Sequence, residues 1–318
     1  MRILVTGAAG QVGTDLLPLL VDRGDRVTVL DVAPRPATCP DSVTWIRGDV
    51  TLEADVFDAV KASCPDVIHH LAAILSARGE TMPHQTWRVN LEGTRHVLEA
   101  ARVLEAGQVF YPSTIAAFGP GPPDLVPNEV SMRPTTMYGV TKVAGELLGE
   151  YYQQRFGLDF RGVRFPGLIN AGIPGGGTSD YALFMFVEGL RKGEYAAFCE
   201  PRAKIPFMYM PDALRAILEL AAAPKERLTR SIYNIAAVSP TAEEFAEAAR
   251  ARIPGVRITF EPVEELQAIL DSWPRALDDT PARNDWGWRH EYDLDRMSDD
   301  LVARMKILLA EAAAPAGA

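Results

Sequence analysis

Tyr138 and Lys142 are the two residues of this chain whose types and spacing most clearly suggest chemistry. Four residues apart on a helix, they would share one face. A phenol beside an ammonium can transfer a proton, because the positive charge favours the phenolate. To act as a base near neutral pH, the tyrosine needs its pKa lowered by roughly 2–3 units from ~10. The YxxxK spacing is common, so the pair needs support from elsewhere in the chain.

Two hydroxyl residues, Ser113 and Thr114, end a predicted strand that precedes the helix of this pair. Either hydroxyl could hydrogen-bond the substrate oxygen whose proton Tyr138 takes. Hydride would then pass from the same carbon to a nicotinamide. The spacing does not decide which of the two hydroxyls does this.

A glycine-rich turn follows the first predicted strand and opens a helix. It reads GAAGQVG, from Gly7 through Gly10, Gln11 and Val12 to Gly13. Glycines let the backbone approach a pyrophosphate, and the helix N-terminus offers unpaired N–H groups and the positive end of its dipole. This strand–turn–helix context predicts a dinucleotide site; the competing interpretation is an ordinary strand–helix turn.

Asp31 ends the second predicted strand, eighteen residues after Gly13. A carboxylate at this place accepts hydrogen bonds from the adenine ribose hydroxyls and repels a 2′-phosphate. We therefore predict NAD as the cofactor. The nearby Arg35 keeps NADP as an alternative, and a solvated strand end is the bland interpretation of Asp31.

Further cofactor contacts are predicted where other strands end. Asp49 and Val50 follow the third strand, where an Asp side chain could meet the adenine amine. Small residues end the fourth strand and leave room for a cofactor. For these positions a plain turn and core packing are the competing interpretations. The expected cofactor contacts at strand ends are Asp49, Val50, Leu71, Ala72, Ala73 and Pro166.

Strands alternate with helices through the first half of the chain. This alternation predicts a Rossmann-type α/β fold, a doubly wound parallel sheet with helices on both faces. The predicted strands are Arg2–Thr6, Arg26–Leu30, Val43–Arg47, Asp66–Leu71, Gln108–Tyr111 and Phe160–Phe165, followed by Lys204–Met210, Ser231–Ala236 and Arg257–Glu261. The predicted helices include Glu53–Ser63, Thr86–Ala106, Ala182–Lys192, Pro211–Ala222 and Thr241–Ala251.

The sequence texture changes after Phe165, where glycine and proline become frequent. We expect residues 1–165, with return segments at about 204–236, to form the dinucleotide-binding domain. Residues 166–203 and 237–310 would then form a smaller substrate-binding α/β region. Residues 311–318 are expected to be a disordered tail.

Composition excludes several classes of protein. The 318 residues carry a net charge of −10, which argues against nucleic acid or anionic membrane as a partner. No apolar run reaches roughly eighteen residues, so no membrane span is predicted. The start of the chain runs straight into a strand-like segment, so no secretory signal is predicted. The scattered Cys39, Cys64 and Cys199 and the five histidines have no metal-ligand spacing, which predicts a reduced, cytoplasmic protein without a metal site.

The helix that carries Tyr138 also has an apolar stripe on roughly the opposite side. Gly145 and Gly149 share the face of the Tyr–Lys pair and would allow close contact with the sheet. The apolar stripe then needs a cover, and we expect a second subunit to supply it in a homodimer. The stripe comprises Val140, Val143, Ala144, Leu147, Leu148, Tyr151 and Tyr152.

Together the glycine loop, Asp31, GDV, LAA, Asn90, the Ser–Thr pair and YGVTK resemble the extended short-chain dehydrogenase/reductase superfamily. The resemblance covers about the first 170 residues and implies that Tyr138 and Lys142 also hold the nicotinamide ribose. It also implies that Asn90 packs behind the active site; a structural helix asparagine is the competing interpretation.

Motifs across nearly the whole chain are similar to the short-chain type of L-threonine 3-dehydrogenase. They are HLAAILSARGE, PSTIAAFGP, RPTTMYGVTKVAGE, GLINAGIPGGGTSDYA, IPFMYMPDA and LDDTPARNDWGW. Sugar-nucleotide epimerases usually carry R-x-x-N-x-Y-G-P after the sixth strand. Here the residues from Arg164 to Asn170 read RFPGLIN, which counts against an epimerase.

A small anionic substrate fits the glycine-rich segment of residues 175–178. Its glycines, including Gly177, and the Thr178 hydroxyl could bind a carboxylate; a flexible linker is the competing interpretation. Ser76 lies after the fourth strand and could bind substrate, although a structural role is slightly favoured. Trp273 could close the pocket, although packing is favoured.

The resemblance implies NAD-dependent oxidation of L-threonine at C3 to 2-amino-3-oxobutyrate, without a metal. Tyr138 would be the general base, Lys142 would lower the Tyr138 pKa, and Ser113 or Thr114 would orient the hydroxyl. The β-keto acid product would lose carbon dioxide readily. A sugar-nucleotide epimerase or dehydratase of the same superfamily is the first alternative. A non-enzymatic NAD-binding regulator is the second.

Overall fold

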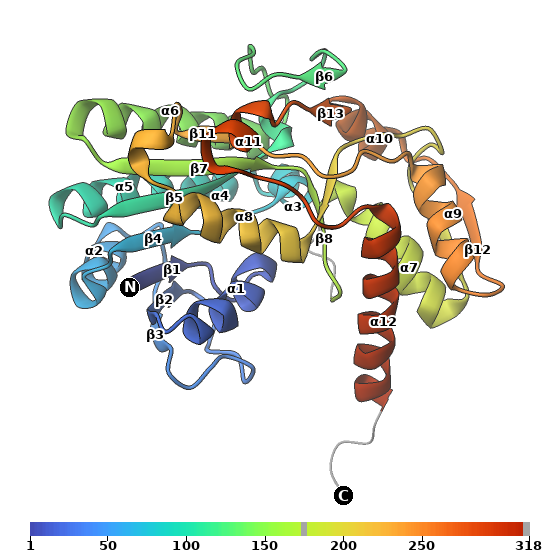
Figure 1. The fold of residues 1–318 in the computed structure, drawn as a ribbon, viewed down its shortest axis with the longest axis horizontal. Coiled ribbons are helices and arrows are strands. Elements are labelled where there is room, and N and C mark those ends of the chain that lie inside the picture. Colours follow the sequence, from blue (N-terminus) through green and yellow to red (C-terminus); the bar gives the residue numbers. More distant parts are fainter. Residues whose placement is uncertain (173–176, 314–318) are drawn as a thin grey trace, which may run out of the picture.

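A parallel β-sheet of seven strands forms the centre of the molecule in the computed structural model, which describes residues 1–172 and 177–313 (Figure 1). The strand order is β11-β7-β5-β4-β1-β2-β3, so the chain winds outward in both directions from the middle. This order confirms the predicted doubly wound Rossmann-type fold. The strands are β1 (Arg2–Thr6), β2 (Arg26–Asp31), β3 (Thr44–Arg47), β4 (Val67–His70), β5 (Gln108–Thr114), β7 (Asp159–Phe165) and β11 (Ile232–Asn234).

Both faces of the sheet are buried, because alternate side chains of each strand point to opposite faces. In β1, Ile3 and Val5 pack on one face and Leu4 on the other. The first face is covered by α1 (Gln11–Asp22), α8 (Met210–Ala222) and α11 (Thr280–Trp286). The second face is covered by α2 (Glu53–Ser63), α5 (Gly93–Val103) and α6 (Met137–Phe156). These layers hold the strand ends, and hence the site, in fixed positions.

The predicted helix over Thr86–Ala106 is wrong in detail, because the segment divides into three parts. They are α4 (Pro83–Trp87), a π-helical turn η1 (Arg88–Glu92) and α5. A π turn inserts a residue and changes which side chains face inward, and such turns often occur at functional sites. Here it directs Asn90 into the protein, where its side chain is 2% exposed and bonds the backbone of Ile74.

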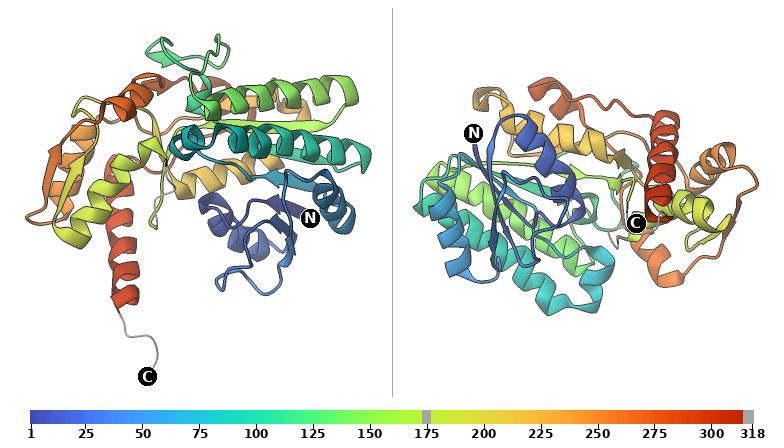
Figure 2. Two further views of the ribbon diagram at one scale, coloured as in Figure 1. Left: turned by 180° about the vertical axis from the view of Figure 1, so that it is seen from behind. Right: turned by 90° about the horizontal axis from the view of Figure 1, so that it is seen from below.

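A second group of elements lies beside the sheet, toward the carboxyl ends of its strands (Figure 2). Its own hydrophobic core includes Phe186, Phe245 and Leu301. The group comprises α7 (Tyr181–Lys192), β9 (Glu194–Ala197), α9 (Ala242–Arg252), β12 (Arg257–Phe260), α10 (Glu264–Asp271) and α12 (Leu294–Ala313). The parallel pair β9–β12 is its small sheet.

Short strand pairs and turns connect the two groups of elements. β8 (Gly167–Ile169) pairs with β10 (Phe207–Tyr209), and β6 (Leu125–Val126) pairs with β13 (Ala276–Leu277). The predicted strand Lys204–Met210 is therefore shorter than expected and lies outside the main sheet. The remaining turns are α3 (Ser76–Thr81), η2 (Ile115–Ala117), η3 (Thr178–Asp180) and η4 (Lys225–Arg227).

Two further expectations concern the chain end and the membrane. The predicted tail 311–318 begins inside α12, which continues to Ala313, and residues 314–318 lie outside the described residues. Among the described residues, no helix combines the length and apolarity needed to span a membrane.

Candidate active site

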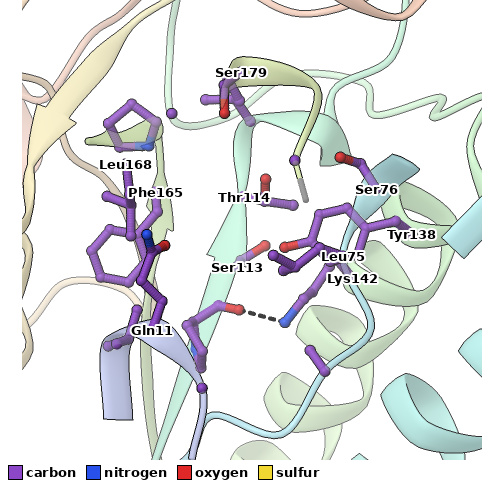
Figure 3. Close-up of a pocket in the computed structure, with 18 of the residues that line it drawn as sticks. Gln11, Leu75, Ser76, Ser113, Thr114, Tyr138, Lys142, Phe165, Leu168 and Ser179 are labelled. Carbon is purple, nitrogen blue, oxygen red and sulfur yellow. Dashed lines mark hydrogen bonds between the residues drawn. The ribbon is translucent and has the colours of Figure 1, made fainter. Parts of the chain in front are cut away.

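A cavity of about 220 Å³ opens at the carboxyl edge of the sheet. The ends of β1, β4, β5 and β7 meet there, as expected for a ligand site in an open α/β sheet. Tyr138, Lys142, Ser113 and Thr114 all line it, together with the glycine loop (Figure 3). The structure therefore brings the predicted catalytic and phosphate-binding residues into one space, although they are far apart in the sequence.

The glycine loop approaches its neighbours too closely for side chains. Gly7 has φ +70°, and a Cβ there would lie 2.5 Å from the backbone of Ala72. A Cβ on Gly13 would lie 2.4 Å from Ala8. Gly10, which precedes α1, supplies no side-chain cap, so the N–H groups of the first turn remain available to a ligand. With Gly7, Gly10, Gln11 and Val12 on the cavity wall, this cradle fits a pyrophosphate.

Asp31 lies at the end of β2, next to the glycine loop. Its carboxylate accepts hydrogen bonds from Ala9 N at 2.8 Å and Ala33 N at 2.9 Å, which fixes both oxygens at the loop. The Arg35 guanidinium donates instead to the carbonyls of Cys39 and Pro40. Asp31 does not line the cavity itself, but this position beside the loop fits a ribose, and Arg35 is engaged elsewhere.

The other predicted cofactor residues divide into three sets. Leu71, Ala73 and Pro166 line the cavity. Ala72 lies behind the loop, where its backbone faces Gly7. The remaining two lie outside the cavity: Asp49 caps the turn before α2 by accepting from Thr51 N at 2.8 Å, and Val50 packs into the core of the second face.

Asn90 holds the segment that follows β4 rather than lining the cavity. Its Oδ1 accepts from Ile74 N at 2.8 Å, and its Nδ2 donates to Ile74 O at 3.0 Å. The same Nδ2 donates to Thr141 Oγ1 on α6 at 3.2 Å. The side chain therefore connects the segment after β4 to the helix that carries Tyr138.

Tyr138 and Lys142 lie on the first two turns of α6 and face the sheet, on one helical face as predicted. Thr136 caps the helix, accepting from Gly139 N at 3.1 Å, and so fixes where Tyr138 stands. The Lys142 Nζ donates to Pro112 O at 2.7 Å (Figure 3). It lies 4.7 Å from the ring centroid of Tyr111 and 5.7 Å from that of Tyr138. The ammonium is thus anchored beside the phenol.

Burial controls the protonation of this pair. It raises the pKa of Tyr138 to about 12, while a hydrogen bond with Thr114 acts in the opposite direction. Burial also lowers the pKa of Lys142 to about 7, opposed by the charge of Glu146. The predicted lowering of the Tyr138 pKa is therefore not seen in the protein alone. The physical reason is that loss of hydration penalises the phenolate and the ammonium alike.

Ser113 and Thr114 end β5 but have different partners. The Ser113 hydroxyl donates to the carboxylate of Glu146, an interaction buried behind the cavity wall. The Thr114 hydroxyl accepts from Ala116 N at 3.2 Å and hydrogen-bonds Tyr138. Both hydroxyls line the cavity.

Glu146 and Arg164 form a buried ion pair that the sequence analysis did not identify. The guanidinium donates from Nη2 to Glu146 Oε2 at 2.8 Å, and both side chains are almost fully buried. The position of Glu146 in the sequence could have indicated this pair. Glu146 follows Lys142 by four residues and so lies on the same helix face, which meets the sheet. Arg164 lies on the neighbouring strand β7.

The substrate-binding predictions fall at the far end of the cavity. Ser76 and Gly177 line it, and Ser76 Oγ accepts from Thr178 N at 3.5 Å. Thr178 is 1% exposed and does not line the cavity. Gly175 and Gly176, which belong to the same predicted loop, lie outside the described residues.

Several cavity residues come from segments that sequence reasoning did not connect to the site. Trp273, for which packing was favoured, lines the cavity. Asp180 also lines it, and its carboxylate accepts from Gly177 N at 3.0 Å. The other unpredicted lining residues are Leu75, Pro112, Ile115, Phe165, Gly167, Leu168 and Ser179, whereas Gly13 belongs to the predicted glycine loop.

Comparison with known proteins places this geometry in a family. The model of the NAD dependent epimerase/dehydratase family matches residues 3–236. A Bos taurus protein named mitochondrial L-threonine 3-dehydrogenase is 41% identical over 301 residues, which cover 93% of this chain and 80% of that protein. The chain belongs to the L-threonine 3-dehydrogenase family, within the NAD dependent epimerase/dehydratase family.

Solved structures agree with this family membership. The L-threonine dehydrogenase of Clostridium difficile is 39% identical, with a TM-score of 0.92 over 96% of this chain and 98% of that one. A monomeric L-threonine 3-dehydrogenase from a metagenome, in its apo form, is 36% identical, with a TM-score of 0.91 over 96% and 99% of the two chains. The sequence-based resemblance, the enzyme class and the prediction of NAD as cofactor are thereby confirmed.

Proposed function

We propose that this protein oxidises L-threonine at C3 to 2-amino-3-oxobutyrate with NAD. The observation that carries the proposal is the convergence of Tyr138, Lys142 and Thr114 with the glycine loop on one cavity. The L-threonine 3-dehydrogenases to which the chain is similar support the choice of substrate.

Bound NAD supplies the acceptor for the hydride that leaves C3. Tyr138 takes the proton of the C3 hydroxyl through its phenolate oxygen. Thr114, which hydrogen-bonds Tyr138, orients the reacting oxygen. Lys142, fixed by Pro112 O, presents a cation beside the phenol and to the nicotinamide ribose. The apolar walls formed by Leu75, Leu168 and Trp273 exclude water.

Different parts of the chain are proposed to bind the cofactor and the substrate. In our proposal, residues 1–165 with 204–236 bind the cofactor, and residues 166–203 with 237–310 complete the substrate site. The proposed substrate contacts are Ser76, Ser113, Thr114, Tyr138, Gly177 and Thr178. The proposed cofactor contacts are Gly7, Gly10, Gln11, Val12, Asp31, Asp49, Val50, Leu71, Ala72, Ala73, Asn90, Tyr138, Lys142 and Pro166.

The test is an assay of NADH absorbance with L-threonine or L-serine and with NAD or NADP. We expect NADH formation with L-threonine and NAD, and slower or no reduction of NADP because Asp31 repels a 2′-phosphate. Turnover of UDP-sugars without NADH formation from L-threonine would instead support an epimerase. Cofactor binding without turnover of either substrate would support a regulator.

We also propose a homodimer formed through α6. Val140, Leu147 and Tyr151 are 38%, 58% and 53% exposed on this helix, whereas Tyr152, expected on the same stripe, is buried and donates to Glu99. A contiguous apolar patch of this kind favours an interface. One relative is described as monomeric. Sedimentation equilibrium of the protein and of Leu147→Glu should give a dimer and a monomer; a monomer for the unaltered protein would disprove the interface.

A reducing compartment such as the cytoplasm is the proposed location. Cys39, Cys64 and Cys199 are free thiols. The Bos taurus relative is named as mitochondrial, so an organelle is the alternative location. Fractionation of the source cells followed by immunodetection distinguishes the cytosol from a membrane-bounded compartment.

A further inference from the structure

The hydroxyl of Ser113 faces two environments, the substrate cavity and a buried ion pair. It lines the cavity beside Thr114 and Tyr138 (Figure 3). It also contacts Glu146 Oε1, which accepts from Arg164 Nε at 3.0 Å. The pair is almost completely shielded from solvent, since Glu146 and Arg164 are 2% and 5% exposed.

Arg164 forms an ion pair with this carboxylate and holds it in place. Its Nη2 donates to Glu146 Oε2 at 2.8 Å, while Nη1 donates to Asn128 O at 2.8 Å and Asn234 Oδ1 at 3.1 Å. A buried charge pair with all of its hydrogen bonds satisfied has a single preferred arrangement. The network therefore fixes the position of the acceptor that meets Ser113.

The single proton of the Ser113 hydroxyl decides whether this hydroxyl donates or accepts hydrogen bonds in the cavity. A serine hydroxyl has one proton to donate and two lone pairs to accept with. An ionised carboxylate only accepts, so the Ser113 proton must lie on the bond to Glu146. Toward the cavity, Ser113 can therefore act only as an acceptor.

Thr114 is arranged in the opposite way. Its oxygen accepts from Ala116 N at 3.2 Å, which leaves the hydroxyl proton free to point toward Tyr138 or a bound oxygen. A substrate alcohol that transfers its only proton to Tyr138 has no proton left to donate to Ser113, but its oxygen can accept a hydrogen bond from Thr114. The ammonium of an amino acid, in contrast, carries three N–H donors that need acceptors.

We propose that Glu146, held by Arg164, is a positioning residue that fixes Ser113 as an acceptor for the substrate ammonium, while Thr114 serves the reacting alcohol. This inference rests on the proposed oxidation of an amino acid alcohol. It assigns different roles to two adjacent hydroxyls that the sequence does not separate. It also gives the buried ion pair a function in the recognition of the substrate.

The first experiment compares Ser113→Ala with the unaltered protein. We expect KM for L-threonine to rise about tenfold or more, the effect of losing a hydrogen bond to a charged group, with kcat within about threefold. The competitive inhibitor (R)-3-hydroxybutyrate has the same carboxylate and alcohol but no ammonium. Its Ki should stay within about twofold. An equal rise in the Ki and in KM would place Ser113 on the alcohol or carboxylate and overturn the proposal.

The second experiment tests whether Glu146 acts through Ser113. In Glu146→Gln an amide replaces the carboxylate that accepts from Ser113. In Glu146→Asp the shorter side chain keeps the negative charge that pairs with Arg164 but moves it away from Ser113. Both should raise KM for L-threonine by about tenfold in the unaltered background and by less than about twofold in the Ser113→Ala background. The aspartate variant retains the ion pair and serves if the glutamine variant does not fold. An equal effect in both backgrounds, or no effect, overturns the proposal.

The matched control is Asp159→Asn. Asp159 pairs with Arg161 on the same strand as Arg164, at 2.7 Å and largely buried, but neither residue lines the cavity. This variant should lower the unfolding temperature without changing KM, because it removes an ion pair that has no connection to Ser113. Failure of the unaltered protein to oxidise L-threonine would refute the proposed function itself, whereas the variant ratios test only this inference.

Discussion

Burial is the dominant influence on single residues of the site. It raises the pKa of Tyr138 to about 12 and lowers that of Lys142 to about 7, so each group is pushed toward its neutral form. The ammonium is also bound to Pro112 O rather than to the phenol. Within the protein, Thr114 is therefore the neighbour that favours the phenolate.

Removal of the Tyr138 hydroxyl tests the proton acceptor. Tyr138→Phe keeps the ring beside Lys142 and should retain NAD binding. We expect kcat with L-threonine to fall by roughly 10² or more, because the proposed general base is lost. Steady-state rates together with NAD titration by fluorescence measure both effects. A near-normal rate would exclude Tyr138 as the base.

The pH profile tests the link between Thr114 and Tyr138. The Thr114 hydrogen bond lowers the pKa of Tyr138, so its loss in Thr114→Val raises that pKa further. A smaller phenolate fraction then exists at any given pH, and the rising limb of kcat/KM should move to higher pH. In Ser113→Ala the limb should stay in place, because the Ser113 proton is directed to Glu146. An unmoved limb in Thr114→Val would contradict this link.

At the scale of the element, α6 is positioned by two glycines, Gly145 and Gly149, on the face that meets the sheet. A Cβ on Gly145 would lie 2.2 Å from the Tyr111 hydroxyl, and one on Gly149 would lie 2.0 Å from the Phe160 ring. The helix axis therefore lies close to the sheet, and this closeness brings Tyr138 and Lys142 to the end of β5.

We expect Gly149→Ala to lower stability, which is the opposite of the usual effect of a glycine-to-alanine substitution in a helix. Alanine normally stabilises a helix interior by about 1 kcal/mol relative to glycine. Here the added methyl must displace Phe160, and we expect the free energy of unfolding to fall by about 1–3 kcal/mol. Urea denaturation measures the change. Gln154→Ala, at an exposed position of the same helix outside the proposed interface, is the control and should change stability far less. A stabilised Gly149→Ala would contradict the tight packing.

Local patterns in the sequence predicted the sheet, the glycine loop and the shared face of Tyr138 and Lys142, because these depend on short-range periodicity. The π turn at Asn90 could not be predicted, since it depends on contacts with Ile74, sixteen residues away. The partner of Ser113 was also missed. A glutamate at position 146 of a helix is typical of a solvated residue, and only the close approach of α6 to the sheet buries it against Arg164.

At the scale of the whole molecule, the cavity is assembled by segments far apart in the chain. Trp273 and Ser179 meet Gly10 and Ser113 there. A hydrogen bond of 2.8 Å from Asn170 to Asp15 joins the segment after β8 to α1. Such contacts are a property of the tertiary fold, which explains why the substrate end of the site was the least predictable from the sequence.

The two histidines that end β4 make the stability of the whole molecule depend on pH. Burial lowers the pKa of His69 and of His70 to about 3. His70 is held neutral between Thr6 Oγ1 at 2.7 Å, at the end of β1, and Thr94 Oγ1 at 3.0 Å, on α5. In the unfolded chain a histidine takes up a proton near pH 6.5. The unfolded state therefore binds more protons below that pH, and folding stability falls as the pH is lowered.

We expect the free energy of unfolding to be constant with respect to these histidines above about pH 6.5 and to decrease below it. Each histidine costs about 1.4 kcal/mol per pH unit, so the pair should cost about 4 kcal/mol between pH 6.5 and 5.0. Carboxylates with lowered pKa values, such as Asp66 and Glu99, contribute mainly at still lower pH. Urea denaturation at pH 7.5 and 5.0 measures the loss. His69→Leu removes one titrating group and should halve the loss, whereas equal stability of the unaltered protein at both pH values would show that these rings are protonated in the folded state.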